Sequence, residues 1–263
     1  MSDKDNAQFS RDSTRNTLIV AIGVSFICSI LVSTAAIVLR PTQQANEAAF
    51  QQAIVLQVAG LYDPDESVAS QFEAIETRIV NLETGEYVDM DPGEFDAEEA
   101  ANDPSMSIAI PTEDDVAGLK RRAIYAPVYL VSDGGRVSQV ILPVRGKGLW
   151  STLYGFLAVE PDGNTVRGLK FYEHAETPGL GDQIDRPSWQ AQWEGLEITD
   201  ASGQPQIEVV RGLAPEGSDY AVDGLAGATL TGRGVEKLVR FWTGQQGFGP
   251  YLTRLGSEAN NNG

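Results

Sequence analysis

The chain has 263 residues, and its 37 acidic and 19 basic side chains give a formal net charge of −18, which disfavours binding to nucleic acid or adsorption to an anionic lipid surface. The single cysteine, Cys28, excludes a disulfide within the chain. The sequence contains no P-loop, no Cys-x-x-Cys pair, no zinc-ligand set and no Gly-x-Gly-x-x-Gly in a strand-to-helix context, so it does not predict NADH binding by this chain.

An uncharged apolar segment, residues 18–39, predicts a transmembrane helix. A helix of this length covers about 33 Å, and a bilayer core is about 30 Å thick. The alternative is a cleaved signal peptide, but the apolar part of such a peptide has only about 7–15 residues. A retained anchor is therefore favoured, with Pro41 marking its exit. Cys28 lies inside the span, either as a small apolar residue or as one ligand of a shared metal cluster.

Basic residues are distributed unevenly about this segment. Lys4, Arg11 and Arg15 precede it, whereas Arg40 is the one basic residue that follows it before Arg78. The positive-inside rule places the N-terminus in the cytoplasm and, for a bacterial inner-membrane protein, the main domain in the periplasm. The predicted organisation is a cytoplasmic tail (1–17), one transmembrane helix (18–39), a periplasmic domain (40–255) and a disordered tail (256–263).

The first part of the exported domain alternates between helical and irregular patterns. Apolar residues at near-helical spacing predict a helix over 50–61 and a second helix from Val68, changing to strand near Arg78. Residues 89–115 are rich in carboxylates and interspersed with prolines, which is typical of a solvated loop. This segment lacks the spacing of a calcium loop.

Three predicted hairpins follow one another along the chain. Residues 79–82 and 87–88, 124–131 and 137–145, and 154–159 and 166–171 flank turn sequences rich in Gly, Asp and Asn. Consecutive hairpins favour an antiparallel sheet over a parallel one. We therefore expect an α+β fold, with an antiparallel sheet, packed helices and one N-terminal transmembrane helix.

The segment Asp-Gly-Leu-Ala-Gly-Ala-Thr-Leu-Thr, residues 223–231, precedes a strongly amphipathic pattern. Val235, Leu238, Val239 and Trp242 share one helical face, so the segment lies at a helix N-terminus and presents Thr229 there. Such a terminus has unpaired N–H groups and favours a phosphate. The plain alternative is a turn with a threonine N-cap, because a free threonine is a poor nucleophile.

Two further segments combine backbone freedom with polar and aromatic side chains. These are Gly-Lys-Gly-Leu-Trp (146–150) and Glu-His-Ala-Glu-Thr-Pro-Gly-Leu-Gly (173–181). The alternative interpretation is two ordinary loops, with Trp150 filling the core. His174, the single histidine, is interpreted as a hydrogen-bonded loop residue rather than a proton relay.

Taken together, these motifs resemble the C subunits of the sodium-translocating NADH:quinone oxidoreductases, and the similarity extends over essentially the whole chain. The resemblance implies that a flavin transferase attaches FMN to Thr229 through a phosphoester, with Asp223 part of the recognised motif. Ala226 departs from that motif, because the family commonly has a hydroxyl residue there. The other implied FMN-binding residues are Gly227, Ala228, Leu230, Thr231, Lys147, Trp150, Glu173, Thr177 and Leu180.

The resemblance also implies a function as an electron relay with no catalytic residue or metal ligand of its own. The chain would accept electrons from a metal centre in the membrane and pass them to a flavin on a neighbouring subunit, toward quinone, while Na⁺ is pumped. Its partners would be the membrane, flavin and iron–sulfur subunits of the same complex. The alternatives are the G subunits of the related complexes that couple ferredoxin and NAD, a membrane-tethered scaffold without a redox role, and a stand-alone exported flavin reductase.

Overall fold

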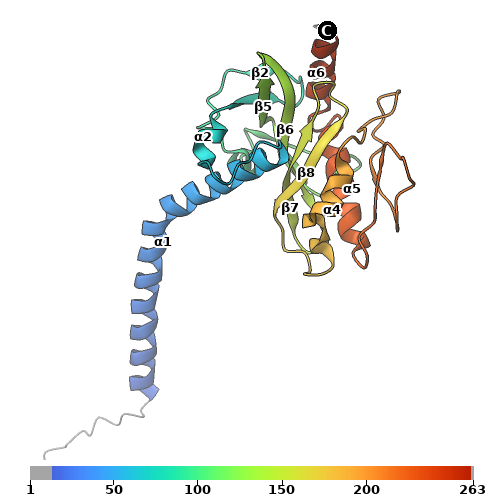
Figure 1. The fold of residues 1–263 in the computed structure, drawn as a ribbon. Coiled ribbons are helices and arrows are strands. Elements are labelled where there is room, and N and C mark those ends of the chain that lie inside the picture. Colours follow the sequence, from blue (N-terminus) through green and yellow to red (C-terminus); the bar gives the residue numbers. More distant parts are fainter. Residues whose placement is uncertain (1–13, 262–263) are drawn as a thin grey trace, which may run out of the picture. The chain divides into compact units, whose positions relative to one another are not determined.

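A computed structural model describes residues 14–261 and begins with one long helix (Figure 1). This helix, α1 (Thr14–Val58), contains both the expected transmembrane segment and the start of the helix expected over 50–61. Pro41, which was expected to mark the end of the span, lies inside the helix. The residues after it are mostly Gln, Ala and Glu, which are strong helix formers and account for the continuation.

The chain divides into two compact units, residues 1–50 and residues 51–263. Among the described residues, α1 is the one helix that is long and apolar enough to cross a membrane, and most of it belongs to the first unit. Its most apolar window has a mean hydropathy of 2.4, and none of that window is buried.

The second unit contains a six-stranded antiparallel sheet in the order β2-β1-β5-β6-β7-β8. The three expected hairpins are present, and they are the pairs β1–β2, β5–β6 and β7–β8. The strands are β1 (Ile75–Asn81), β2 (Tyr87–Val88), β5 (Tyr125–Asp133), β6 (Arg136–Lys147), β7 (Thr152–Val159) and β8 (Val166–Glu173).

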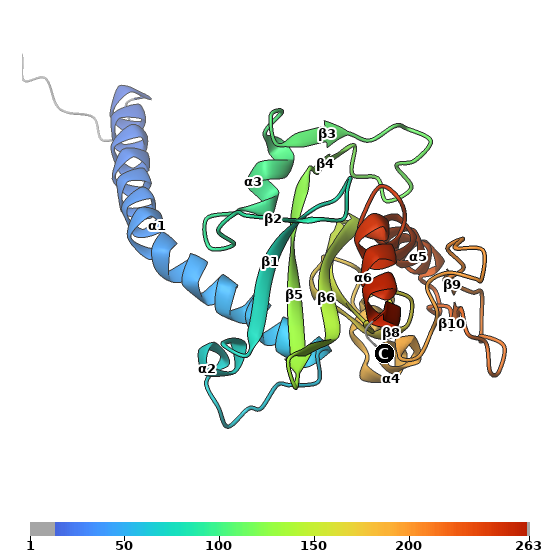
Figure 2. The same ribbon diagram turned by 90° about the horizontal axis from the view of Figure 1, so that it is seen from above.

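Alternation along the strands buries apolar side chains on both faces of the sheet. In β6, Val140 and Leu142 face the larger core cluster, which includes the apolar faces of α5 (Thr229–Thr243) and α6 (Gly249–Asn261). Ile141, between them, faces a smaller cluster with Ile54 and Val55 of α1. Figure 2 shows α5 and α6 together on one side of the sheet. This arrangement is the expected α+β fold.

Smaller elements refine the expectations for the irregular segments. Residues 89–115, expected to form a solvated loop, include α3 (Ala97–Asn102), which the side chain of Asp96 caps at its N-terminus. They also include β3 (Ser107–Ala109), which pairs with β4 (Arg121–Ala123). The remaining elements are α2 (Val68–Phe72), the 3-10 helices η1 (Gly181–Asp185) and η2 (Ala191–Trp193), α4 (Pro187–Gln190), and the parallel pair β9 (Glu208–Val209) and β10 (Ala221–Val222).

The second predicted helix ends earlier than the sequence pattern suggested. It is the short α2, and strand geometry already begins at Ile75, because β1 pairs with β5 over its whole length. Of the C-terminal residues 256–263, expected to be disordered, 256–261 form the last turns of α6, and 262–263 lie outside the described residues. Local contacts hold these turns: Arg254 pairs with Glu258 at 2.8 Å, and the Ser257 hydroxyl donates to the Thr253 carbonyl at 2.8 Å.

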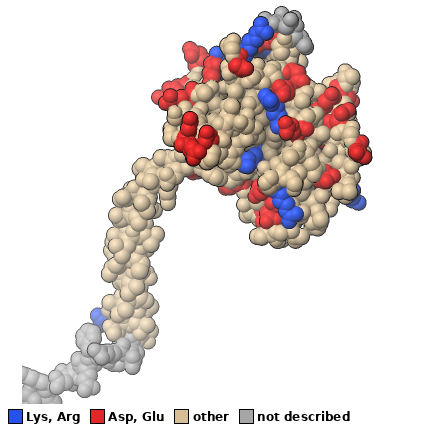
Figure 3. Space-filling view, viewed as in Figure 1, with Lys and Arg blue, Asp and Glu red and all other residues tan. Residues whose placement is uncertain are grey.

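Charge is distributed very differently over the two units. Most of the visible face of the long helix carries neither acidic nor basic side chains, whereas acidic groups are spread over the body formed by the second unit (Figure 3). An uncharged helical surface suits a lipid environment, and a charged surface suits water.

Candidate functional site

The sheet topology brings two of the expected site segments to one end of the sheet. Lys147, the last residue of β6, lies opposite Thr152, the first residue of β7, and Glu173 at the end of β8 lies opposite Tyr154. The 148–151 loop leads into β7 and the 174–180 loop follows β8, the neighbouring strand, so the two loops lie at the same end of the sheet. The sequence predicts these strands, whereas the pairing of β6 with β7 is a finding of the structure.

Helix α5 brings the third segment to the same place by packing closely along β6. A Cβ added to Gly234 would lie 2.7 Å from the Lys147 carbonyl oxygen, and one added to Gly146 would lie 2.9 Å from Cβ of Leu238. The indole N–H of Trp242 donates to the Arg145 carbonyl at 2.6 Å. The glycines are required here because the helix approaches the strand too closely for a side chain.

Thr229 is the first residue of α5, and it is exposed. The N-cap is Ala228, and no side chain caps the helix, so the alternative of a threonine N-cap is wrong for Thr229. Its hydroxyl is therefore not used to close the helix. The N–H groups of the first turn lack intrahelical partners, as at every helix start, and provide positive potential beside this hydroxyl.

Exposed apolar side chains surround this helix start. Leu230 is 57% exposed, Leu180 is 44% exposed, and Trp150 is 70% exposed, so the alternative interpretation, in which Trp150 fills the core, is wrong. Leu180 lies against Gly227: a Cβ added there would be 3.0 Å from its Cδ2. The side-chain amide of Gln183 donates to the carbonyls of Leu180 and Ala226 and so ties the two segments together.

A residue outside the expected set, Glu176, forms the centre of the site. Its side chain is buried, and its Oε1 accepts the backbone N–H of Trp150 at 2.9 Å. Its Oε2 accepts the hydroxyl of Thr231 at 2.6 Å. Thr231 was expected to contact the phosphate. Its hydroxyl instead donates a hydrogen bond to this carboxylate, and the residue is fully buried.

His174 orients the same loop, as a hydrogen-bonded loop residue. Its Nδ1 accepts the backbone N–H of Glu176 at 3.2 Å, and its Nε2 lies 2.8 Å from Oδ2 of Asp185. Because Nδ1 accepts a hydrogen bond from a backbone N–H group, the ring carries its own hydrogen on Nε2, which donates to the carboxylate. Both ring nitrogens are engaged, so His174 is poorly placed to act as a general base.

Asp223 acts inside the fold rather than at the exposed surface of the site. Oδ1 accepts the Ala214 N–H at 2.7 Å, Oδ2 accepts the Gln192 side-chain amide at 3.1 Å, and the backbone carbonyl accepts the Trp189 indole N–H at 2.8 Å. These bonds fix the backbone that leads into the Gly-Ala-Thr segment. Asp223 therefore fixes the backbone conformation of the segment that precedes Thr229.

The remaining expected residues lie at the rim. Lys147, Glu173 and Thr177 are exposed, as is Gly227, whose φ of +74° is a left-handed conformation that favours glycine. The Thr177 carbonyl accepts the Leu180 N–H at 3.0 Å and closes the turn of the 174–180 loop. Ala228 is buried beneath the helix start.

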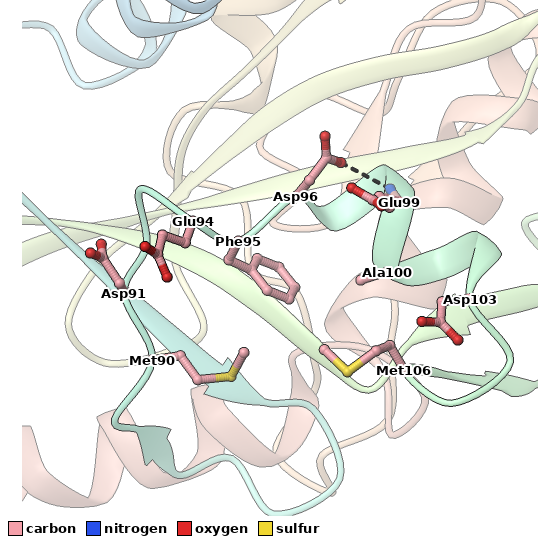
Figure 4. Close-up of a pocket in the computed structure, with 9 residues that line it drawn as sticks. All are labelled: Met90, Asp91, Glu94, Phe95, Asp96, Glu99, Ala100, Asp103 and Met106. Atoms are coloured by element: carbon pink, nitrogen blue, oxygen red, sulfur yellow. Dashed lines mark hydrogen bonds between the residues drawn. The ribbon is translucent and has the colours of Figure 1, made fainter.

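A separate cavity of about 400 Å³ lies over α3 (Figure 4). Its apolar lining alternates with carboxylates, whose charge opposes the phosphate of a flavin nucleotide. Hydrogen bonds from Ser105 hold the pKa of one of them, Asp103, below its usual value. Among the described residues, no cluster of three or more His, Cys, Asp or Glu side chains could hold a metal ion. The lining residues are Met90, Asp91, Glu94, Phe95, Asp96, Glu99, Ala100, Asp103 and Met106.

The site at the start of α5 fits FMN better than this cavity does. An uncapped helix start with an exposed hydroxyl suits the phosphate, and the exposed side chains of Trp150, Leu180 and Leu230 suit an aromatic ring. Lys147 adds an exposed positive charge at the rim.

Comparison with known proteins agrees with this assignment. Residues 148–244, which contain both loops and α5, match the family model described as the FMN-binding domain. The structure is similar to the crystal structure of Shewanella oneidensis NqrC, with a TM-score of 0.73 and 38% identity over 79% of this chain and 96% of that one. It is also similar to the corresponding Na⁺-translocating NADH-quinone reductase subunit of Parabacteroides distasonis, with a TM-score of 0.61 and 28% identity over 82% and 96%.

Curated relatives extend the similarity to nearly the whole chain, and they are C subunits of Na⁺-translocating NADH-quinone reductases. The relative from Vibrio alginolyticus is 48% identical, covering 94% of this chain and 96% of the relative. The relative from Yersinia pestis is 44% identical, covering 97% of each. From the fold, the site and these relatives, the chain belongs to the family of the C subunits of the Na⁺-translocating NADH-quinone reductases.

Proposed function

We propose that this protein carries one FMN bound covalently to Thr229 and relays electrons within its complex. Family membership makes the chain a subunit of an oxidoreductase complex. The observation that supports the attachment point is the exposed hydroxyl of Thr229, at the first residue of an uncapped helix inside the FMN-binding domain.

Bound FMN supplies the redox chemistry, and the chain supplies its position and surroundings. The first turn of α5 offers backbone N–H groups to the phosphate, and Gly227 leaves room beside it. Trp150, Leu180 and Leu230 offer apolar surface to the isoalloxazine, while Lys147 offsets negative charge. Glu173 and Thr177 offer polar groups at the rim of the same surface.

Attachment requires a second protein, a flavin transferase. A threonine hydroxyl is a weak nucleophile without an adjacent base, and both ring nitrogens of His174 are already engaged. In the reaction Oγ1 of Thr229 forms a bond to the flavin phosphorus of a flavin nucleotide donor, the bond from that phosphorus to the donor's leaving group breaks, and the hydroxyl proton is lost to the transferase or to water. The chain thereby gains the mass of FMN less one water. A covalent bond prevents loss of the cofactor from an exported domain.

The relay operates between other cofactors of the complex. With FMN bound, the chain would accept electrons from a metal centre in the membrane and pass them to a flavin on a neighbouring subunit, toward quinone, while Na⁺ moves outward. Helix α1 anchors the chain in the bacterial inner membrane, with the N-terminus in the cytoplasm and the flavin domain in the periplasm. The close full-length relatives favour this function over a scaffold or a component of the ferredoxin-coupled complex.

Replacement of Thr229 tests the attachment point. The full chain, made in cells that contain the flavin transferase, is expected to retain yellow, fluorescent flavin after denaturing electrophoresis. Thr229→Ala should be colourless and folded, whereas Thr112→Ala, at an exposed threonine of the acidic segment, should remain flavinylated. Covalent flavin retained in Thr229→Ala would contradict the proposal.

A further inference from the structure

The carboxylate of Glu176 connects two parts of the site that lie far apart in the sequence. It accepts N–H groups from the 148–151 loop, at 2.9 Å from Trp150 and 3.4 Å from Ser151. It also accepts the Thr231 hydroxyl from the first turn of α5. All three groups are hydrogen-bond donors. An ionised carboxylate suits them because both of its oxygens accept hydrogen bonds.

The side chain of Glu176 packs closely against two glycines. A Cβ on Gly148 would lie 2.5 Å from Oε1 of Glu176, and one on Gly181 would lie 2.8 Å from Cβ of Glu176. The backbone N–H of Glu176 is itself held by His174. The carboxylate is only 4% exposed, so its charge is poorly screened by solvent.

The position of this charge has a consequence for the helix start. Thr231 is the third residue of α5, so the carboxylate lies beside the turn that begins with Thr229. A negative group beside a helix N-terminus stabilises it through the helix dipole. The same charge opposes the uptake of negative charge by a group attached to that turn.

We propose that Glu176 is the positioning residue of the flavin site: it holds the Trp150 loop against the first turn of α5 and lowers the redox potential of the attached flavin. This inference rests on the proposed function, since it assumes FMN on Thr229. Glu176 acts through Trp150 and Thr231, which its hydrogen bonds hold in place. Its negative charge destabilises the reduced flavin relative to the oxidised flavin and so lowers the redox potential.

Two substitutions separate the charge from the hydrogen bonds. In Glu176→Gln, the amide oxygen can still accept the Trp150 N–H, and the amide nitrogen can donate to the Thr231 hydroxyl, so the connection stays while the charge is lost. Glu176→Ala removes both. Glu194→Gln, at an exposed carboxylate outside the site, is the matched control for the loss of one negative charge.

The flavinylated full chain is examined by redox titration, by flavin fluorescence anisotropy and by amide hydrogen exchange at Trp150. Glu176→Gln should keep the covalent flavin and the exchange rate of the parent, with a midpoint potential above that of both the parent and Glu194→Gln. Glu176→Ala should also raise the potential, lower the anisotropy, and speed exchange at Trp150 about tenfold or more.

The outcomes distinguish this inference from the proposed function. An unmodified Thr229 in the parent contradicts the proposed function, while amide exchange at Trp150 still tests the connection made by Glu176. If the flavin is present and Glu176→Gln leaves its potential unchanged, the electrostatic role is wrong. Unchanged exchange and anisotropy in Glu176→Ala would overturn the positioning role. If Glu176→Ala does not fold, Thr231→Val removes one bond alone, and Thr231→Ser should restore it.

Discussion

The hydroxyl of Thr231 donates a 2.6 Å hydrogen bond to the buried carboxylate of Glu176, 55 residues earlier in the chain. This bond links the loop after β8 to the helix that begins with Thr229. Together with the bonds from the Gln183 side chain to the carbonyls of Leu180 and Ala226, it joins two segments that are separate in the sequence into one site.

Loss of this hydroxyl should destabilise the domain. In Thr231→Val the shape of the side chain is nearly kept, but a buried carboxylate oxygen loses its donor, at an expected cost of roughly 1–3 kcal/mol. Urea unfolding monitored by circular dichroism measures this change in the free energy of unfolding. Thr231→Ser keeps a hydroxyl and should cost much less; equal losses for Val and Ser would contradict the assigned role of the bond.

Close packing of α5 on β6 should make Gly234→Ala destabilising. Alanine favours a helix interior over glycine by about 1 kcal/mol, which alone predicts a gain in stability. The added Cβ, however, would meet the Lys147 carbonyl at 2.7 Å, and backbone atoms do not yield as a flexible side chain does. Overpacking of this kind costs roughly 1–3 kcal/mol, so a net loss is expected.

Thermal unfolding of the Gly234→Ala and Lys237→Ala variants tests whether Gly234→Ala lowers the stability. Lys237 is exposed on the same helix, and its replacement should leave the melting temperature close to that of the parent. A melting temperature for Gly234→Ala at or above the parent value would show that α5 does not approach β6 as closely as described.

Burial of a tyrosine should make the domain less stable at high pH. Burial raises the pKa of Tyr129, whose ring packs edge-on against Phe72 and Phe156, to about 12. Below the unfolded pKa, near 10, both states hold the proton and the stability is fully present. Between about pH 10 and 12 the unfolded chain loses the proton first, so stability falls by roughly 1.4 kcal/mol per pH unit.

Denaturant unfolding at several pH values measures this slope. Tyr129→Phe cannot release a proton there and should show a shallower decline. The pKa of Tyr251 is also raised by burial, so some decline should remain. An identical slope in the parent and Tyr129→Phe would exclude Tyr129 as its source.

The sidedness of the membrane anchor predicts where a protease can act. In spheroplasts, an added protease should cleave the domain formed by residues 51–263, because the positive-inside rule places it in the periplasm. A cytoplasmic marker protein should remain intact in the same sample. Protection of the domain until the membrane is lysed would reverse the proposed orientation.

The main features of the fold could be predicted from the sequence because local patterns determine them. The three hairpins follow from alternating strands around turn residues, and α5 follows from Val235, Leu238, Val239 and Trp242 on one face. Local patterns were misleading where a boundary depends on context. The helix predicted from Val68 ends already at Phe72, and residues 256–261 form part of α6.

The centre of the site was not predictable in the same way. Glu173 ends β8 and Glu176 lies three residues later in the following loop, and spacing alone does not show which one is buried. The structure leaves Glu173 exposed and places Glu176 between Gly148 and Gly181, residues whose missing side chains make room for it. The fit between Glu176 and these two glycines joins segments that are distant in the sequence. It produces no periodic pattern from which it could be predicted.

Peptide mass spectrometry of the chain purified from its native membrane tests the central claim most directly. The account predicts that the peptide containing Thr229 carries the mass of FMN less one water and that fragmentation places the added mass on Thr229. An unmodified Thr229 peptide from cells known to hold the flavin transferase, or flavin attached to another residue, would contradict it.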